Sequence, residues 1–504
     1  MPERAQTAGR AAASVALDFL SPLPPVRSGI ADYSVDLLPH LAAAGDVRVL
    51  ALPGQPVDPE VAERFGVVPA EAARPAAGWA AEPRLALYQM GNNRHHAPVQ
   101  AIALERPGIL TLHDLVLHHL LSEETLGERD FAAYRRRLAA DHGWVGEEAA
   151  GPRAWGARVE AMLFELPAHR TLLRRQRGVL VHNRRAAERI AEEDPEVRVA
   201  VVPMGVPLPP PVDPGAGRDF RRRFGVPEEA PVLGSYGFQT PIKRTVRAVE
   251  ALAAPGLAGV HLLIVGEAPT APHEPVEPGG SGRPDDLLEL ARELGVAERV
   301  HVTGFVAPED FAPSIAACDL ALNLRYPTAG ETSASLLRVL ALGRPAVVSD
   351  YAQFAELPDA VVVKAPLGPA ERGDGGEVEA LARELAALLA APERLAAMGE
   401  AAREHVRRHH DPAAAAAAVW AACREWAAAE PPNERSADRP AAPPSATSLT
   451  RERLPGRLER LDPGAEWPAG ERRGGPGRRR RGRPGGRSRP GRGGLRASAR
   501  GRGW

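Results

Sequence analysis

The feature that most constrains the fold of this 504-residue chain is a repeated alternation of short apolar runs with longer helical segments. The apolar runs are rich in Val, Leu and Ile, and polar loops follow them. Such runs are typical of parallel strands that are buried on both faces, with helices covering the sheet. The alternation occurs in two successive stretches, so we predict an α/β protein with two doubly wound parallel sheets.

The expected strands of the first stretch are Val15–Leu20, Val47–Leu52, Leu85–Tyr88, Gly108–Leu112, Gly178–His182 and Val197–Val202. Those of the second are Val232–Tyr236, His261–Val265, Val300–Thr303, Leu320–Leu324, Ala346–Ser349 and Ala360–Val363. Expected helices include Thr245–Leu252, Asp285–Leu294, Ser335–Leu342 and Pro412–Ala429. The chain is too long for one core. We expect a flexible N-terminus (1–13), a first domain (14–205), a Pro-rich linker (206–229), a second domain (230–410), a terminal helix (411–430) and a disordered tail (431–504).

The C-terminal tail is strongly basic, although the whole chain has a net charge of −1. Residues 431–504 contain 19 Arg against 7 acidic residues and little apolar material to bury, which predicts disorder. The tail could be an electrostatic arm for nucleic acid or an anionic surface, or a solvated extension without a partner. From Glu471 onward Trp504 is the sole aromatic, and the chain shows no folded nucleic-acid module, so we expect no nucleic-acid partner.

The two cysteines, Cys318 and Cys423, are too few for a disulfide framework or a cysteine-rich zinc site. No apolar stretch is long enough to span a bilayer. A cytoplasmic location therefore fits best, and contact with the membrane surface stays open. His-rich segments lack a third ligand at metal spacing, so no metal is expected, and no cofactor motif opens either half.

The unusual polar segments each follow an expected strand. They are SPLPPVRSGIADYS, GNNRHH, HDLVLHH, GFQTPIKR, GEAP, GFV and RYPTAGETS, in chain order. Because the carboxyl ends of parallel strands lie at one edge of a sheet, ligands of such folds bind there. We therefore expect all of these segments to open on one crevice between the two domains.

The segment GETSASLL (330–337) has the composition of a helix entrance. Thr332 or Ser333 can cap the helix, and the amides of its first turn suit a phosphate or sugar oxygen. Glu331 can accept hydrogen bonds from sugar hydroxyls. The alternative is an ordinary capped helix with an exposed Glu, and Arg338 can either reach a phosphate or only line the helix.

Lysine is rare in this chain, since only Lys243 and Lys364 are found among 63 basic residues. Lys243 and Arg244 precede a helix, where their charges could meet a diphosphate. A solvated pair of charges is the usual alternative. The rarity of lysine favours a function for Lys243 and leaves Arg244 undecided.

In the first half, several loop residues are candidates for contacts with a hydroxylated ligand. Ser28 and Gly29 form a flexible point where backbone can approach a ligand closely. His113 can bond a sugar hydroxyl, and Asp114 can orient it or bind the acceptor. The weaker candidates, because loop Asn residues usually form turns, are Asn92, Asn93 and His96.

Taken together, these segments resemble the retaining glycosyltransferases of the GT-B fold, in the group 1 or family-four class. The likeness covers about residues 14–428 and is strongest over 231–359. It implies two Rossmann-like domains that face a central cleft. The first would bind a hydroxylated acceptor, such as a glycan or lipid-linked sugar with peripheral membrane contact, and the second a nucleoside diphosphate sugar.

The resemblance also implies a set of site residues. His113, Lys243 and Glu331 would be catalytic. The donor would contact Gly29, Phe238, Lys243, Arg244, Gly304, Phe305, Val306, Glu331, Thr332, Ser333, Ala334, Ser335 and Arg338. The acceptor would contact Ser28, Asn92, Asn93, His96 and Asp114.

The chain departs from the class at two charged positions. Phe238 stands where the class has a diphosphate-binding Arg. Arg338 stands at the second Glu of a Glu–seven–Glu pattern, and Gly330 falls at the first, one residue before Glu331. The implied reaction is metal-independent sugar transfer to a hydroxyl with retained configuration. The alternatives are a phosphorylase or epimerase of the same fold, a non-catalytic sugar-nucleotide sensor, and an RNA-associated protein acting through the tail.

Overall fold

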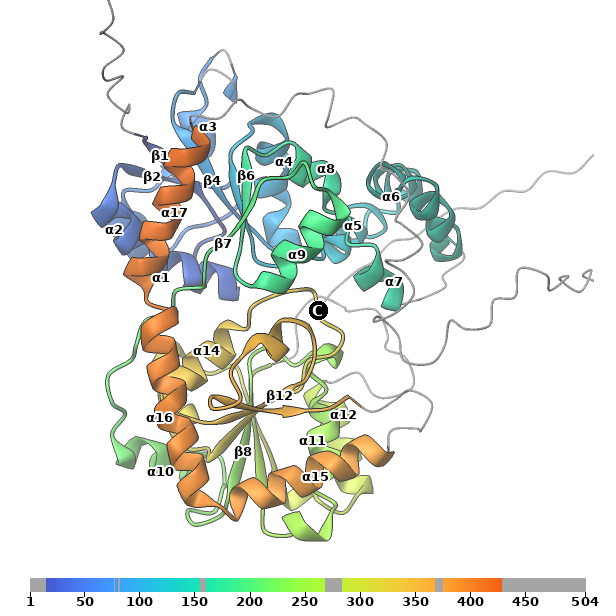
Figure 1. Cartoon of the computed structure of the whole chain (residues 1–504), viewed down its shortest axis with the longest axis vertical. Helices are drawn as coiled ribbons and strands as arrows, with labels where there is room; N and C mark the ends of the chain where they lie inside the picture. The colour runs from blue at the N-terminus through green and yellow to red at the C-terminus, as the bar shows by residue number, and fades with distance from the viewer. Residues whose placement is uncertain are drawn as a thin grey trace, which may run out of the picture. The chain divides into compact units, whose positions relative to one another are not determined.

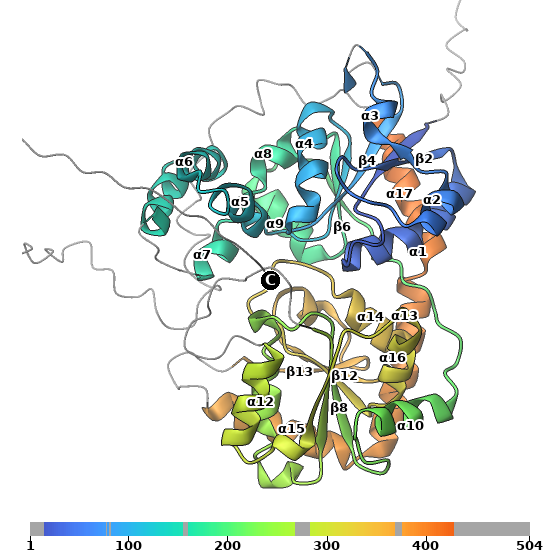
Figure 2. The ribbon, with the colours of Figure 1, turned by 180° about the vertical axis from the view of Figure 1, so that it is seen from behind.

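The computed structural model describes residues 15–76, 78–79, 82–154, 160–267, 283–367 and 375–427. They form two lobes, each a parallel sheet covered by helices (Figure 1 and Figure 2). The seven strands of the first lobe have the order β3-β2-β1-β4-β5-β6-β7, and the six of the second have the order β10-β9-β8-β11-β12-β13. The predicted pair of doubly wound parallel sheets is therefore confirmed. The expected flexible N-terminus and disordered tail lie outside the described residues.

The strands of the first lobe are β1 Leu17–Leu20, β2 Val47–Ala51, β3 Val68–Pro69, β4 Leu85–Met90, β5 Ile109–Leu112, β6 Gly178–Val181 and β7 Val199–Val201. Those of the second are β8 Val232–Tyr236, β9 His261–Val265, β10 Val300–Gly304, β11 Leu320–Asn323, β12 Ala346–Ser349 and β13 Val362–Ala365. Each predicted strand is present to within a few residues. The sequence gives no apolar run for the two-residue edge strand β3, which was not predicted.

The helices of the first lobe are α1 Gly29–Ala44, α2 Pro59–Phe65, α3 Ala70–Ala73, α4 Ala97–Glu105, α5 His118–Thr125, α6 Phe131–Ala154, α7 Glu160–Glu165, α8 Arg170–Arg174 and α9 Arg184–Glu193. Those that follow are α10 Pro214–Arg223, α11 Thr245–Ala251, α12 Pro284–Glu293, α13 Pro308–Ala316, α14 Ala334–Ala341, α15 Gly375–Leu389, α16 Pro392–His409 and α17 Pro412–Ala427. Within the range expected to be a linker, α10 packs against α13 and buries Phe220.

The strand order places the chain's polar loops at the switch points of both sheets. In the first lobe β1 lies between β2 and β4, and in the second β8 lies between β9 and β11. In the first sheet the connections after β1 and β4 therefore lie on opposite faces, and in the second sheet those after β8 and β11 do. Each pair of connections opens a crevice at the carboxyl edge of its sheet. The loops after β1, β4, β5, β8 and β11 are those predicted to carry the site.

The last helix, α17, returns to the first lobe and packs against α1 (Figure 1). Trp420 on α17 is almost completely buried, and its indole Nε1 donates to the Leu41 carbonyl at 3.0 Å. Gly45 makes room for this ring, since a Cβ there would lie 2.4 Å from it. The chain thus crosses between the lobes a second time after α16.

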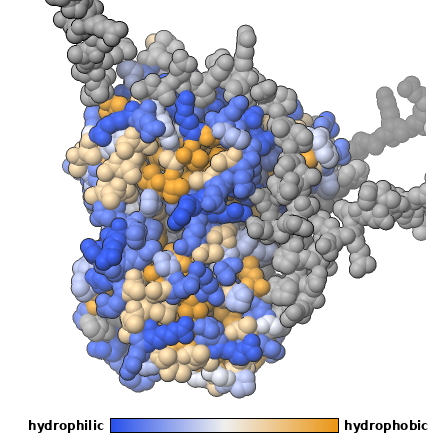
Figure 3. All heavy atoms as spheres, viewed as in Figure 1, coloured by the Kyte–Doolittle hydropathy of each residue, from blue (hydrophilic) through white to orange (hydrophobic). Residues whose placement is uncertain are grey.

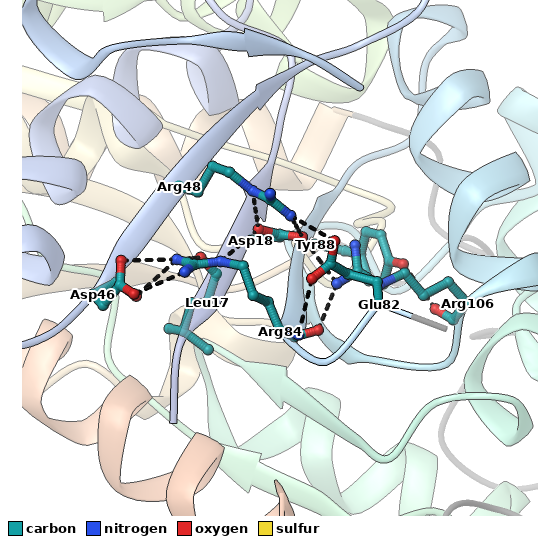
Figure 4. Close-up of polar contacts among 8 residues, drawn as sticks. All are labelled: Leu17, Asp18, Asp46, Arg48, Glu82, Arg84, Tyr88 and Arg106. Atoms are coloured by element: carbon teal, nitrogen blue, oxygen red, sulfur yellow. Dashed lines mark hydrogen bonds and ion pairs between the residues drawn. The ribbon is translucent and has the colours of Figure 1, made fainter. Parts of the chain in front are cut away.

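A charged cluster lies on the first sheet around Asp18 of β1 (Figure 4). The completely buried Asp18 carboxylate accepts from Arg48 at 2.7 and 2.8 Å, from Arg84 at 3.0 Å, and pairs with Arg106 at 2.9 Å. Burial alone would raise the pKa of Asp18, but the bonds and charges of Arg48 and Arg106 outweigh it and lower that pKa. Asp18 is the second residue of β1 and Arg84 directly precedes β4, so the cluster lies at the amino ends of these strands, opposite to the carboxyl edge.

The visible face of the molecule intersperses hydrophilic and hydrophobic residues (Figure 3). Cys318 and Cys423 are buried and free. None of the helices in the described part of the chain has the length and apolar character needed to cross a bilayer.

Candidate functional site

The loop between β11 and α14 forms the centre of the site. Its last residue, Ser333, caps α14 by accepting a bond from the Leu336 amide at 3.3 Å, as the sequence predicted for Thr332 or Ser333. Gly330 has a φ of 80° and lies against the first lobe, where a Cβ would be 2.6 Å from Leu115 Cβ. This position therefore requires glycine for both its conformation and its packing.

Glu331 is held by neighbours within this loop. One carboxylate oxygen pairs closely with Arg325, and the other accepts from the Thr328 hydroxyl at 2.7 Å. The backbone carbonyl of Glu331 accepts a hydrogen bond from Nε2 of the Gln353 side chain at 2.7 Å. The carboxylate is thus fixed on Arg325 rather than extended toward solvent.

Lys243 lies beside this loop. Its ammonium donates to the Tyr236 carbonyl at the end of β8, and a Cβ on Gly237 would lie 2.9 Å from its Nζ. The Tyr326 amide donates to the Ile242 carbonyl at 2.8 Å, which joins the lysine segment to the loop. Burial lowers the pKa of Lys243 well below its ordinary value, as does the charge of Arg325. The structure therefore brings Lys243 and Glu331 into one site.

Two other predicted donor residues have partners elsewhere. Arg244 forms a bidentate pair with Glu377 of α15 at 2.6 and 2.8 Å and borders a separate cavity of about 420 Å³. Arg338 of α14 donates to Asp36 of α1 at 2.9 Å and so links the two lobes. The Phe238 side chain, by contrast, is 37% exposed at the loop after β8.

The Gly-Phe-Val turn after β10 meets the first lobe. Gly304 has a φ of 67°, and the half-exposed ring of Phe305 lies 4.3 Å from the Arg27 guanidinium carbon. Arg27 also pairs with Glu267 at 3.2 Å. Val306 is partly buried against the core. The turn therefore offers one aromatic surface, and Arg27 from the loop after β1 lies against it.

His113 lies almost buried at the end of β5, and each of its ring nitrogens lies within hydrogen-bond distance of another side chain. Nε2 lies 2.9 Å from Gln89 Oε1, and Nδ1 lies 3.1 Å from Nε2 of His182. His182 Nδ1 donates to the Val202 carbonyl at 2.9 Å, because a carbonyl can only accept. Burial lowers the pKa of His182 to about 4 and that of His113 well below its usual range, so both rings are neutral at pH 7.

Asp114, the next residue, faces the loop after β11. Its carboxylate accepts from the Asn92 amide at 2.9 Å. Burial, and then the negative charge of Glu331, raise the pKa of Asp114 to about 7, although the Asn92 bond and Arg325 oppose this. Asp114 is therefore an acid from the first lobe that titrates near neutral pH beside residues of the second.

The loop after β4 holds itself together. The Asn92 side chain accepts from the Leu120 amide at 3.1 Å and contacts His119 at 2.7 Å. Asn93 caps the following turn and lies 3.1 Å from Nδ1 of the buried His96. These side chains have the turn-forming role that was the alternative in the sequence.

At the loop after β1, Ser28 accepts from the Ile30 amide at 3.3 Å and begins α1. A Cβ on Gly29 would meet nothing within 4 Å, so the backbone there is open to approach. This is the local geometry expected from the sequence.

Thr332 lies at a second contact between the lobes. Asn183, at the start of α9, donates to the Thr332 hydroxyl at 3.2 Å and to the Gly330 carbonyl at 3.0 Å. Both residues line a cavity of about 220 Å³. Ala334 and Ser335 follow in the first turn of α14, and the Ser335 hydroxyl lies 3.2 Å from that of Ser333.

Sequence reasoning did not single out Arg325, Asn183, Gln353 or Asp36. Arg325 follows directly after a predicted strand, so the strand-end rule that identified its neighbours could have found it. The other three become relevant only through contacts between segments far apart in the chain. Among the described residues, no group of three or more His, Cys, Asp or Glu side chains is arranged to hold a metal ion.

Comparisons with known proteins identify similar sequences. Residues 232–391 match the family described as Glycosyl transferases group 1. A D-inositol 3-phosphate glycosyltransferase of Segniliparus rotundus is 33% identical over 224 residues, which are 43% of this chain and 44% of the relative. The chain therefore aligns with less than half the length of this curated relative.

Solved structures share the fold over most of the chain. Anabaena Alr3699/HepE in complex with UDP-glucose has a TM-score of 0.56 at 16% identity, covering 81% of this chain and 99% of that one. Sucrose-phosphate synthase of Thermosynechococcus elongatus has a TM-score of 0.55 at 17% identity, covering 83% and 100%. The fold is thus the two-domain GT-B fold. Residues 232–391 are similar to the group 1 glycosyltransferases, as the sequence resemblance predicted.

Proposed function

We propose that this chain transfers a sugar from a nucleoside diphosphate donor to an acceptor hydroxyl, with retained configuration and without a metal ion. The proposal rests mainly on one observation. Lys243, the Arg325–Glu331 pair and the start of α14 meet at the carboxyl ends of β8 and β11. The matching of residues 232–391 to group 1, and the UDP-glucose bound to the HepE structure, support this choice of donor.

The proposed chemistry is stabilisation of the departing diphosphate. The bond between the sugar's anomeric carbon and the phosphate oxygen breaks, and its electron pair leaves with the diphosphate. The acceptor oxygen bonds the same carbon, and its proton passes to the leaving phosphate oxygen on the same face. Negative charge develops on the departing diphosphate as the bond breaks. Lys243 and the backbone amides of the first turn of α14 interact with this charge, so they stabilise the transition state more than the ground state.

We assign the acceptor to the first lobe (14–205) and the donor to the second (230–410). Asp114 is an ionisable group of the first lobe that faces Glu331 and Arg325, because the charges of both residues affect its pKa. Because both ring nitrogens of His113 lie within 3.1 Å of buried side chains of the first lobe, His113 would act by holding the end of β5 in place. The relative's name suggests a phosphorylated polyol as one acceptor to test, and we propose that the reaction takes place in the cytoplasm, at or near the membrane surface.

The chain's two lysines provide a matched experiment. Lys243→Gln should remove most of the rise in Tm that UDP or GDP causes and should abolish sugar release from a donor panel. Lys364→Gln is the control, because Lys364 lies in the same lobe and pairs at 2.7 Å with an exposed Asp359. If no nucleotide raises the Tm of the unaltered protein and no donor is consumed, the proposed function is wrong. A Tm rise without turnover of any donor would instead indicate a sensor.

A further inference from the structure

Arg325 is a second positive charge in the site, and the loop after β11 fixes its position. Its Nη1 pairs with Glu331, and its Nε donates to Asn323 Oδ1 at 3.3 Å. The Arg325 and Glu331 side chains are only 14% and 12% exposed. Its Nη2 makes no hydrogen bond to any of the residues that the structure describes, so one edge of the planar guanidinium still has donors to offer.

This guanidinium lies next to Lys243. The Tyr326 amide, one residue along from Arg325, bonds the Ile242 carbonyl, one residue before Lys243, at 2.8 Å. Asn323, which holds Arg325, also lies 3.4 Å from the Ser333 hydroxyl that caps α14. The ammonium, the guanidinium and the start of a helix therefore converge, and each of them favours an anion.

We propose that Arg325 binds the diphosphate of the donor together with Lys243, and that Glu331 is a positioning residue that orients Arg325. This inference rests on the proposed function and adds to it. Phe238 provides no charge in the loop after β8, so Lys243 alone would face a group with at least two negative charges. Arg325 supplies the missing charge from a different strand, and its fork geometry suits two phosphate oxygens.

The pairing with Glu331 explains how a buried arginine tolerates a neighbouring lysine without a ligand. Two cations near each other repel, and the Glu331 carboxylate offsets part of that repulsion. The same carboxylate holds the guanidinium in one orientation, so little side-chain entropy is lost when the anion binds. Because both carboxylate oxygens of Glu331 already accept hydrogen bonds from Arg325 and Thr328, Glu331 has fewer free acceptor sites for sugar hydroxyls.

The first test measures the Kd of UDP, GDP and uridine by calorimetry. Whichever nucleotide binds the unaltered protein, Arg325→Gln should weaken it by about tenfold to a hundredfold, the range of one charge-assisted bond. Arg325→Lys should recover part of the loss. Any binding of uridine, which lacks phosphate, should not change. An equal Kd for the diphosphate in Arg325→Gln and the unaltered protein would overturn the proposal, as would an equal loss for uridine.

The second test is a double-mutant cycle of Arg325→Gln and Glu331→Gln. If Glu331 acts through Arg325, the second substitution costs little once the first is present, and the losses are far from additive. Additive losses would show that Glu331 contacts the donor independently, against the proposal. Glu377→Gln is the control for Glu331→Gln, since the Arg244–Glu377 pair in the same lobe has the same exposure of 14% and 12%. Glu377→Gln should leave the nucleotide Kd unchanged.

These outcomes separate the two proposals. Diphosphate binding that depends on Arg325 without sugar transfer would overturn the proposed function and leave the anion site standing. If the unaltered protein transfers sugar and Arg325→Gln leaves the nucleotide Kd and the kcat unchanged, the proposed function stands and the role of Arg325 is overturned. Because a buried arginine can also matter for folding, the Tm of each variant is measured without ligand, and Arg325→Lys keeps the test valid if Arg325→Gln unfolds.

Discussion

At Gly237 the backbone has a φ of 86°, and the space that a side chain would fill is occupied by the Lys243 ammonium. Gly237→Ala should therefore have two effects. The left-handed conformation costs about 1–2 kcal/mol of stability for a residue with a Cβ. The new methyl group would also displace Nζ from the Tyr236 carbonyl, so nucleotide affinity should fall several-fold in calorimetry. Gly295→Ala is the control, because its φ is 68° and nothing lies within 4 Å of the added Cβ. If both variants bind nucleotide equally well, the contact with Lys243 has no role.

Asp114 should make the protein less stable at neutral pH than an amide would. Its pKa is raised to about 7 by burial and by Glu331, so the folded state retains a proton that the unfolded chain loses near pH 4. Its stabilising contribution is complete below the unfolded pKa and disappears as the pH rises through about 7.

Asp114→Asn, whose amide oxygen can still accept from the Asn92 amide, should therefore raise the Tm at pH 8. The gain should shrink as the pH falls from 7 to 5. Asp359→Asn, at an exposed position, should show no such trend. A Tm gain that is the same at every pH would contradict the assignment. If Asp114 also binds the acceptor as its carboxylate, the stabilised variant should lose activity at pH 8.

At the scale of single residues the sequence indicated which loops carry the site but not how their charges pair. Lys243 was distinguished by its rarity and Glu331 by its place before a helix. The partners of Arg244 and Arg338, however, are Glu377 and Asp36, and both are far away in the chain. Ion pairs depend on distances between whole elements, which local composition does not contain.

At the scale of elements the prediction was more complete. A parallel strand is buried on both faces, so its sequence is a continuous apolar run that can be recognised. β8 and β9 begin and end at the predicted residues, Val232–Tyr236 and His261–Val265. The short edge strand β3 has no such run and was not predicted. α10 was not predicted, because it lies within the Pro-rich range that was expected to be a linker. Pro214 is nevertheless suited to the first turn of a helix.

The start of α9 depends on a residue from the other lobe. The Asn183 side chain caps the Ala186 amide at 2.8 Å, and the Glu356 carboxylate accepts from the amides of Arg184 and Arg185 at 3.1 and 2.7 Å. Helix starts have free amides that favour a carboxylate. Glu356 thus stabilises α9 only while the lobes are together.

Glu356→Ala should therefore favour a more open arrangement of the lobes. We expect a loss of about 0.5–2 kcal/mol, the usual effect of removing a cap, and a larger radius of gyration by small-angle X-ray scattering. Glu393→Ala, at the exposed first turn of α16, should change neither quantity. An unchanged radius of gyration in Glu356→Ala would show that the other contacts between the lobes suffice.

At the scale of the whole molecule, the chain's last helix and its basic tail should differ sharply in importance. α17 belongs to the second stretch in sequence but packs on α1 of the first lobe, where Trp420 and Trp426 fill spaces left by Gly45 and Gly178. Deleting residues 412–504 should expose this part of the first core, and Trp420→Ala alone should cost about 3–5 kcal/mol.

Deleting only residues 431–504 should leave the Tm and the nucleotide Kd unchanged, because that segment has little apolar surface to bury. The shortened protein should be strongly acidic, since the tail carries a net charge of +12 within a chain of −1. Salt-sensitive RNA binding that disappears with the tail would contradict the expectation of no nucleic-acid partner. Equal Tm values for the two truncations would show instead that α17 adds nothing to the first lobe, and its contacts with α1 would then need another explanation.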